Sequence, residues 1–206
     1  MTITLHHNPF SRAATVVWML EEVGVPYDLR FVDFRSNAQK SPELLAMNPM
    51  GKLPVLEDDG TVVTEVAAIG LYLADRYALG RLAPLPNDPA RGAYLRWSLF
   101  APSVIEPGAM AKMSGWEFKP GQAGWGAYDA MVEAMESALK GDFILGANFS
   151  MADVIFGGTL RYMLRFKMIE ARPSFVAYAE RLGARPALQA AEARNAQIIV
   201  ERGLAT

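Results

Sequence analysis

Two short segments of the sequence place polar side chains where a helix is expected to begin. The segment Asn8–Ser11 (Asn-Pro-Phe-Ser) has the composition of a turn, and Ser11 fits the N-cap of the helix that follows. Ser11 offers a hydroxyl there, and Arg12 adds a positive charge. Glu65 and Val66 also stand at a predicted helix start, where the first backbone N–H groups lack intrahelical acceptors and favour an anion. Both segments are therefore candidates for holding a charged ligand.

The counts of cysteine and histidine exclude several kinds of chemistry. The chain has no cysteine, so it has no disulfide, thiolate metal site, iron–sulfur cluster or cysteine nucleophile. Its two histidines, His6 and His7, are neighbours on a predicted strand, where adjacent side chains point to opposite faces. They are poorly placed to share one metal ion, and we expect no metal site.

Composition predicts a folded globular protein. Of the 206 residues, 51% are hydrophobic and 20% are charged, and the formal net charge is −2. This charge gives no general attraction to nucleic acid or to anionic lipid. The N-terminal residues lack the basic start and apolar stretch of a signal peptide, and the apolar run Val66–Ala74 is far too short to span a bilayer. We therefore expect a cytoplasmic location.

The first part of the chain alternates strand and helix patterns. Residues 2–5 and 27–31 alternate as half-buried strands, and the helix between them ends at Gly24. A short helix begins at Pro42, and two short apolar runs separated by a Glu-Asp-Asp-Gly turn predict a hairpin. A further helix follows. The order β-α-β-α-β-β-α predicts a small mixed sheet covered by helices over residues 1–78.

The second part of the chain carries only helical patterns. Residues 79–89 contain three prolines and are predicted to be a linker, and residues 90–206 are predicted to form an all-α domain. Pro102 and Pro107 are expected to break or kink one of its helices. The segment Ser150–Asp153 has the pattern of a capping box, so Asp153 is expected to be structural.

At this point the sequence resembles the cytosolic glutathione transferases over nearly its whole length. The match is carried by segments in a fixed order and spacing: Asn8–Arg12, Glu21–Tyr27, Asn48–Leu56, Thr64–Ile69 with Tyr72–Asp75, and Phe149–Asp153. The resemblance implies a thioredoxin-like N-terminal domain, an all-helical C-terminal domain and a two-fold homodimer. It also implies a glutathione site on the first domain and a hydrophobic co-substrate site in the cleft between the two.

The resemblance assigns two backbone positions and one charged side chain to glutathione. It implies a cis peptide bond between Leu53 and Pro54, with the Leu53 backbone pairing with the cysteinyl part of glutathione. It places the γ-glutamyl carboxylate on the Val66 N–H and the ammonium group beside Glu65. Many family members have serine where this chain has Val66, and the hydrogen bond of that hydroxyl is absent here. A plainer reading is that Glu65 only complements the helix dipole.

The resemblance places thiol activation in the turn before the first helix. The thiolate is the nucleophilic form of glutathione, and a hydroxyl donor at a helix start stabilises it. Ser11, with Arg12 nearby, is the first candidate for this role, and a shifted alignment makes Asn8 the second. The alternative for Ser11 is an ordinary N-cap that accepts a backbone N–H.

Further candidates lie on loops and on the helical part. Lys40 and Lys52 are candidates to pair with the glycyl carboxylate, although surface lysines are more often simply solvated. Phe10, Trp97, Met110 and Met113 are candidates for the hydrophobic co-substrate site, and aromatic and methionine side chains of this kind also serve as ordinary core.

These observations predict a glutathione transferase that uses glutathione as co-substrate and attacks a small hydrophobic electrophile. Reduction of organic hydroperoxides by the same activated thiol is the second enzymatic possibility. A non-catalytic protein-interaction scaffold of the same fold is the alternative from a different class.

Overall fold

The computed structural model describes residues 2–204, which form two compact units. The first unit comprises the chain up to Tyr77 together with the segment from Arg185 onward, and the second comprises Ala78–Ala184. The C-terminal helix thus belongs to the first unit, although it follows the helical segment in sequence.

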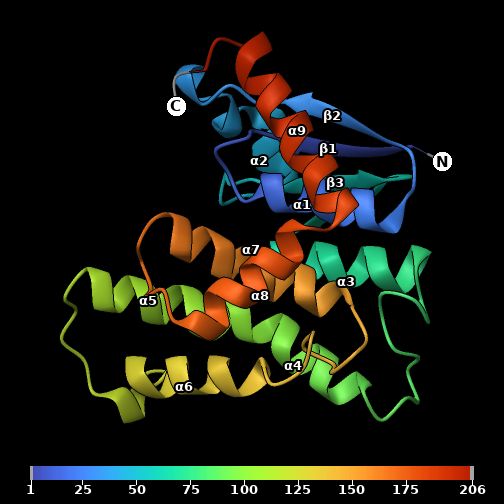
Figure 1. The fold of residues 1–206 in the computed structure, drawn as a ribbon. Coiled ribbons are helices and arrows are strands. Elements are labelled where there is room, and N and C mark those ends of the chain that lie inside the picture. The colour runs from blue at the N-terminus through green and yellow to red at the C-terminus, as the bar shows by residue number, and fades with distance from the viewer. Residues whose placement is uncertain (1, 205–206) are drawn as a thin grey trace. The chain divides into compact units, whose positions relative to one another are not determined.

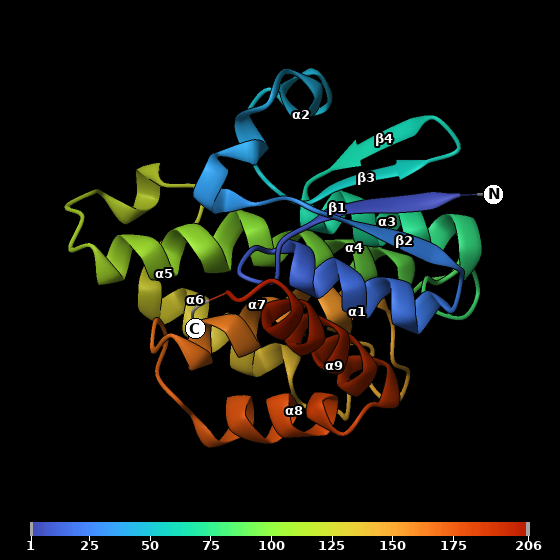
Figure 2. The ribbon, with the colours of Figure 1, turned by 90° about the horizontal axis from the view of Figure 1, so that it is seen from above.

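The first unit is a four-stranded mixed sheet with helices on both faces (Figures 1 and 2). The strand order is β2-β1-β3-β4, in which β1 and β2 are parallel and the other pairs are antiparallel. The elements are β1 (Ile3–His7), α1 (Ala13–Val23), β2 (Tyr27–Phe31), α2 (Pro42–Met47), β3 (Val55–Asp58), β4 (Thr61–Thr64), α3 (Val66–Tyr77) and α9 (Pro186–Glu201). Two 3₁₀ turns, Phe34–Ser36 and Ala38–Lys40, precede α2. This order confirms the predicted β-α-β-α-β-β-α pattern.

The side chains of β1 alternate between the two faces of the sheet, so each one contacts the elements that cover its own face. Ile3, Leu5 and His7 share one face of the sheet, against which α1 packs, and all three are buried. The buried residues of α1 include Val16, Val17 and Leu20, and α1 ends where Gly24 takes a left-handed conformation (φ 78°). Figure 2 shows α2 on the opposite face of the sheet.

A salt bridge holds the start of α9 against α1. Arg185 donates to both carboxylate oxygens of Glu22, at 2.6 and 2.8 Å. The indole Nε1 of Trp18 donates to the same carboxylate at 2.9 Å. Because Glu22 and Trp18 are both buried, this network explains why α9 belongs to the first unit.

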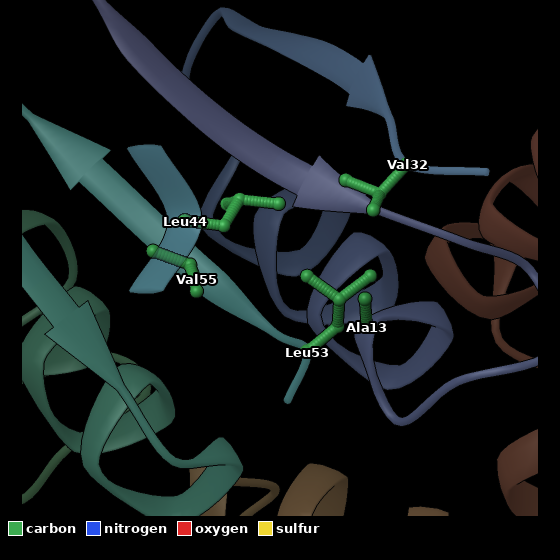
Figure 3. Close-up of a cluster of buried hydrophobic side chains, with 5 residues drawn as sticks. All are labelled: Ala13, Val32, Leu44, Leu53 and Val55. Carbon is green, nitrogen blue, oxygen red and sulfur yellow. The ribbon is translucent and has the colours of Figure 1, made fainter. Parts of the chain in front are cut away.

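A small apolar cluster joins the segments at one end of the sheet (Figure 3). Ala13 comes from the first turn of α1, Val32 follows β2, and Leu44 comes from α2. Leu53 and Val55 come from the chain that enters β3. Packing these five side chains together fixes the start of α1 relative to the residues before β3.

The second unit is helical, as predicted. Its helices are α4 (Arg91–Phe100), α5 (Glu106–Met113), α6 (Tyr128–Ala138), α7 (Met151–Arg165) and α8 (Pro173–Gly183). Between α4 and α5 the chain stays helical through a π-helical turn, Ala101–Ile105, which contains Pro102. Proline lacks the N–H that an α-helix needs, so the change of helix type occurs where the sequence predicts a break.

The predicted capping box forms at the start of α7. Asp153 Oδ2 accepts the backbone N–H of Ser150 at 2.8 Å. Its Oδ1 accepts the N–H of Ile144 at 2.7 Å and the hydroxyl of Tyr178 at 2.8 Å. Asp153 is fully buried, so its carboxylate organises three segments of the second unit.

Within residues 2–204, no helix is both long and apolar enough to cross a membrane.

Candidate functional site

The sheet register brings the predicted site segments to one end of the first unit. His6, next to the end of β1, pairs with Val55, the first residue of β3. Val55 in turn pairs with Thr64, the last residue of β4. The turn after β1, the residues before β3 and the start of α3 therefore emerge at the same end of the sheet. This end carries Ser11, Leu53 and Glu65.

Asn8 is buried and holds the turn before α1 together by hydrogen bonds. Its side chain is 2% exposed, and Nδ2 donates to the Val32 carbonyl at 2.9 Å. Its Oδ1 accepts the Phe10 N–H at 3.0 Å, and its carbonyl accepts the Ser11 N–H at 2.9 Å. Asn8 thus joins the turn to the end of β2, and its polar atoms serve the fold.

Ser11 is half-buried at the start of α1, but the N-cap position itself is held by Arg12. Arg12 has a helical backbone and makes no side-chain capping hydrogen bond, so the capping contact is made one residue earlier, by Ser11, as the N-cap alternative expects. The Ser11 hydroxyl donates to the Asn8 carbonyl at 2.8 Å and accepts the Ala13 N–H at 3.1 Å. The hydroxyl has only one proton, so Ser11 must break its hydrogen bond to the Asn8 carbonyl before it can donate to a sulfur atom.

The turn before β3 repeats the construction of the first turn. Asn48 Nδ2 donates to the Lys52 carbonyl at 2.9 Å, and its Oδ1 accepts the Met50 N–H at 3.1 Å. The Gly51 N–H donates to the Asn48 carbonyl at 2.8 Å. Asn48 was not among the predicted site residues, although the repeated Asn-Pro pairs at 8–9 and 48–49 are a visible signal of two matched turns.

This second turn leads into the Leu53–Pro54 peptide bond, which is cis, as the resemblance implies. The Leu53 side chain is turned into the apolar cluster beside Ala13 (Figure 3). Burial of that side chain fixes the Leu53 backbone relative to the first turn of α1.

Glu65 and Val66 form the junction between β4 and α3. Glu65 is exposed and has a left-handed backbone (φ 69°), an uncommon conformation for a residue with a side chain. Val66 is the first residue of α3, and the first helical hydrogen bond joins the Ile69 N–H to the Glu65 carbonyl at 2.9 Å. The N–H groups of residues 66–68 precede that bond and have the anion-favouring position.

The two candidate lysines differ in their surroundings. Lys40 Nζ donates to the Met50 carbonyl at 2.8 Å and lies over Gly51. Lys52 is exposed and makes no ion pair within the described part of the chain. Lys40 is therefore tied to the same turn that carries Lys52, and both stand near the Leu53–Pro54 bond.

The candidates for a hydrophobic co-substrate site fall into two groups. Phe10 on the first unit and Met113 on the second are 50% and 56% exposed, and Met110 is 38% exposed. Trp97 is 6% exposed and packs edge-on against Phe100 and Phe156, with ring centroids 5.0 and 6.0 Å away. Its position is that of a core residue of the helical unit.

The histidines are used within the fold. His6 Nε2 lies 2.7 Å from Glu57 Oε1 and His7 Nε2 lies 2.7 Å from Asn195 Oδ1, on opposite faces of the sheet. Among residues 2–204, no group of three or more His, Asp or Glu side chains is placed to hold a metal ion.

Comparison with known proteins agrees with this geometry. Residues 1–75 match the family model for the glutathione S-transferase N-terminal domain, and residues 120–190 match that for the glutathione S-transferase C-terminal domain. Glutathione S-transferase 1 of Schizosaccharomyces pombe is 31% identical over 163 residues, a match that covers 68% of this chain and 66% of the yeast protein. Glutathione S-transferase 3 of the same yeast is 36% identical over 106 residues, covering 51% of this chain and 43% of that protein.

A solved structure extends the similarity over nearly the whole fold. The crystal structure of a glutathione transferase homologue from Sulfitobacter, with bound glutathione, has a TM-score of 0.74 and 27% identity. The match covers 94% of this chain and 98% of that one. Matched domains in the expected order, a similar fold and the cis Leu53–Pro54 bond together lead to one conclusion: the chain belongs to the glutathione S-transferase family of enzymes.

Proposed function

We propose that this chain binds glutathione on its first unit and activates the thiol for attack on a small hydrophobic electrophile. The observation that carries the proposal is the register His6–Val55–Thr64, which gathers the three predicted contact segments at one end of the sheet. The Leu53 backbone, in the bend before β3, pairs with the cysteinyl part of glutathione. The start of α3 offers N–H groups to the γ-glutamyl carboxylate, and Glu65 receives the ammonium group.

Ser11 is the proposed donor to the sulfur atom. Its hydroxyl is half-buried at the start of α1 and gives up its hydrogen bond to the Asn8 carbonyl when glutathione binds. A charge-assisted hydrogen bond to a thiolate is stronger than one to a neutral carbonyl, so this exchange favours ionisation of the thiol. Asn8 acts by holding the turn, because both ends of its side-chain amide already have partners.

The proposed reaction is a nucleophilic substitution or addition. The thiol proton passes to solvent, and the sulfur lone pair forms a carbon–sulfur bond with the electrophile. In a substitution, the leaving group departs with its bonding electrons. The protein contributes a lowered thiol pKa and the positioning of both reactants.

The variant Glu65→Gln tests the binding mode. Its carboxamide keeps the size of the side chain and loses the negative charge, so we expect the dissociation constant of glutathione to rise by about tenfold or more. The matched control is Glu180→Gln, which removes an exposed charge on α8 and is expected to leave glutathione binding unchanged. Calorimetric titration of both variants, with turnover of an activated aryl chloride, gives the readout. Equal affinity in Glu65→Gln and wild type would contradict the proposed contact, and absence of binding in wild type would favour the scaffold.

A two-fold homodimer is part of the same proposal. Exposed apolar side chains on the two units, among them Met50, Leu95 and Leu99, support it. Light scattering should give twice the chain mass at micromolar concentration, and Leu99→Glu should shift the mass toward that of a single chain.

A further inference from the structure

A groove with a volume of about 390 Å³ lies on the first unit, between β2 and α9. Tyr27 and Phe31 contribute from the strand, and Arg194, Ile198 and Arg202 contribute from one side of the helix. His7 lines it from β1. Figure 1 shows α9, in red, running past these strands. None of the residues proposed to bind glutathione lines this groove.

The groove results from how the edge of the sheet is covered. β2 is one of the two edge strands, and Tyr27 and Phe31 are half-buried on the same sheet face as His7. α9 packs on α1 beside them, so the strand face is left partly open. The volume of the groove falls within the range of small-molecule sites.

Each end of the groove combines a guanidinium with an aromatic ring. Arg194 lies 5.1 Å from the Tyr27 ring centroid, and Arg202 lies 5.0 Å from that of Phe31. Arg194 also approaches Glu21 at 3.6 Å, whereas Arg202 makes no ion pair closer than 4 Å among residues 2–204, although it interacts electrostatically with Asp33. The acidic neighbour Glu201 already accepts a hydrogen bond at 2.6 Å from Gln197, and Asp28, the other acid of the lining, is exposed on the strand edge. Of the two guanidinium groups, the one at the Phe31 end is therefore the one without a close carboxylate.

His7, which lines the groove from β1, carries a buried acceptor nitrogen. The side chain is fully buried, and its Nε2 donates to Asn195 Oδ1 at 2.7 Å, which leaves Nδ1 as the acceptor nitrogen. Nδ1 is buried and has no hydrogen-bond partner within the described residues. Burial lowers the pKa of His7 to about 4, partly opposed by the hydrogen bond to Asn195, so the ring is neutral near pH 7. A buried acceptor without a donor is costly and is satisfied by a ligand that supplies one.

We propose that this groove binds a hydroxylated aromatic carboxylate. The ring lies against Phe31 and Ile198, the carboxylate pairs with the Arg202 guanidinium, and the hydroxyl donates to His7 Nδ1. The aromatic ring matches a flat apolar wall of the groove, the carboxylate matches a cation without a close ion pair, and the hydroxyl matches an acceptor without a donor.

The experiment is calorimetric titration of the full chain with 2-, 3- and 4-hydroxybenzoate, with benzoate as the ligand that lacks the hydroxyl. We expect saturable binding of at least one hydroxybenzoate and about tenfold weaker binding of benzoate, because the His7 acceptor then stays unpaired. Ile198→Trp fills the groove and should weaken binding by more than tenfold. The matched control is Val200→Trp, which adds the same side chain at an 81% exposed position of α9 outside the groove and should leave binding unchanged.

Glutathione titrated into the same variants separates this site from the proposed active site, since its affinity should be the same in all of them. If Ile198→Trp fails to fold by circular dichroism, Arg202→Gln replaces it, with an expected loss of about tenfold. Undiminished hydroxybenzoate binding in the groove variant would overturn the proposal. Absence of saturable binding at millimolar concentration, or equal affinity for benzoate, would overturn it as well.

Discussion

Replacing Asn8 by alanine tests whether this residue holds the turn or contacts the substrate. The substitution removes the donor to the Val32 carbonyl and the acceptor of the Phe10 N–H. Val32 is buried, so its carbonyl loses a partner without gaining water, at about 2 kcal/mol. The Phe10 N–H belongs to a half-exposed residue and adds about 1 kcal/mol. The expected loss of unfolding free energy is about 3 kcal/mol.

Urea unfolding of wild type and Asn8→Ala measures this loss. For a chain of this size it corresponds to a fall in melting temperature of roughly 6–12 °C. Asn8→Asp keeps the acceptor for Phe10 but places a buried carboxylate against the Val32 carbonyl, so we expect it to lower stability by more than Asn8→Ala does. A stability change below about 0.5 kcal/mol, together with a raised pKa of the bound thiol, would refute this reasoning and make Asn8 the group that contacts sulfur.

Three further predictions concern the thiol, pH and the second unit. Ser11→Ala should raise the pKa of bound glutathione and slow conjugation, while lowering stability by only about 1 kcal/mol; an unchanged thiol pKa in a thiolate absorbance titration would leave Ser11 as a purely structural residue. Burial lowers the pKa of His7 from 6.5 to about 4, so the unfolded chain takes up this proton first and stability falls as pH drops from about 6.5 to 4. Unfolding curves of wild type should lose up to roughly 3 kcal/mol more over this interval than those of His7→Gln, and parallel losses would contradict the assignment. Asp153→Ala leaves buried donors from Ile144, Ser150 and Tyr178 unpaired and should cost roughly 4 kcal/mol by denaturant unfolding, whereas the exposed Asp142→Ala should cost less than about 0.5 kcal/mol.

Most of the fold could be predicted from local sequence patterns. Alternating strands, the glycine that ends α1 and the capping box at Ser150 each depend on residues close in sequence, so these elements could be predicted with their types and order. The pairing of Arg185 with Glu22 joins residues far apart in sequence, and no periodicity in α9 indicates which helix it packs against. The predicted division into 1–78, 79–89 and 90–206 stays a prediction about domains, to which the structure adds the return of α9 to the first unit.

The sequence was enough to predict which segments form the candidate site, but it was less informative about the role of each residue. The family resemblance implied a cis Leu53–Pro54 bond and the pattern at Glu65 indicated a helix start, and both are present. The role of Asn8 depends on the Val32 carbonyl, which lies 24 residues away and is brought near only by the parallel pairing of β1 and β2. Trp97 was predicted for the same co-substrate site as the exposed Met110 and Met113, and only tertiary packing shows that it faces inward.

The central claim, that this chain binds and activates glutathione, is tested most directly by titrating glutathione into the purified protein and following thiolate absorbance across pH. We predict saturable binding and a thiolate signal that is already present near neutral pH, below the range in which the free thiol ionises. Binding with an unshifted thiol pKa would remove the activation step from the account. Absence of binding would contradict the account as a whole.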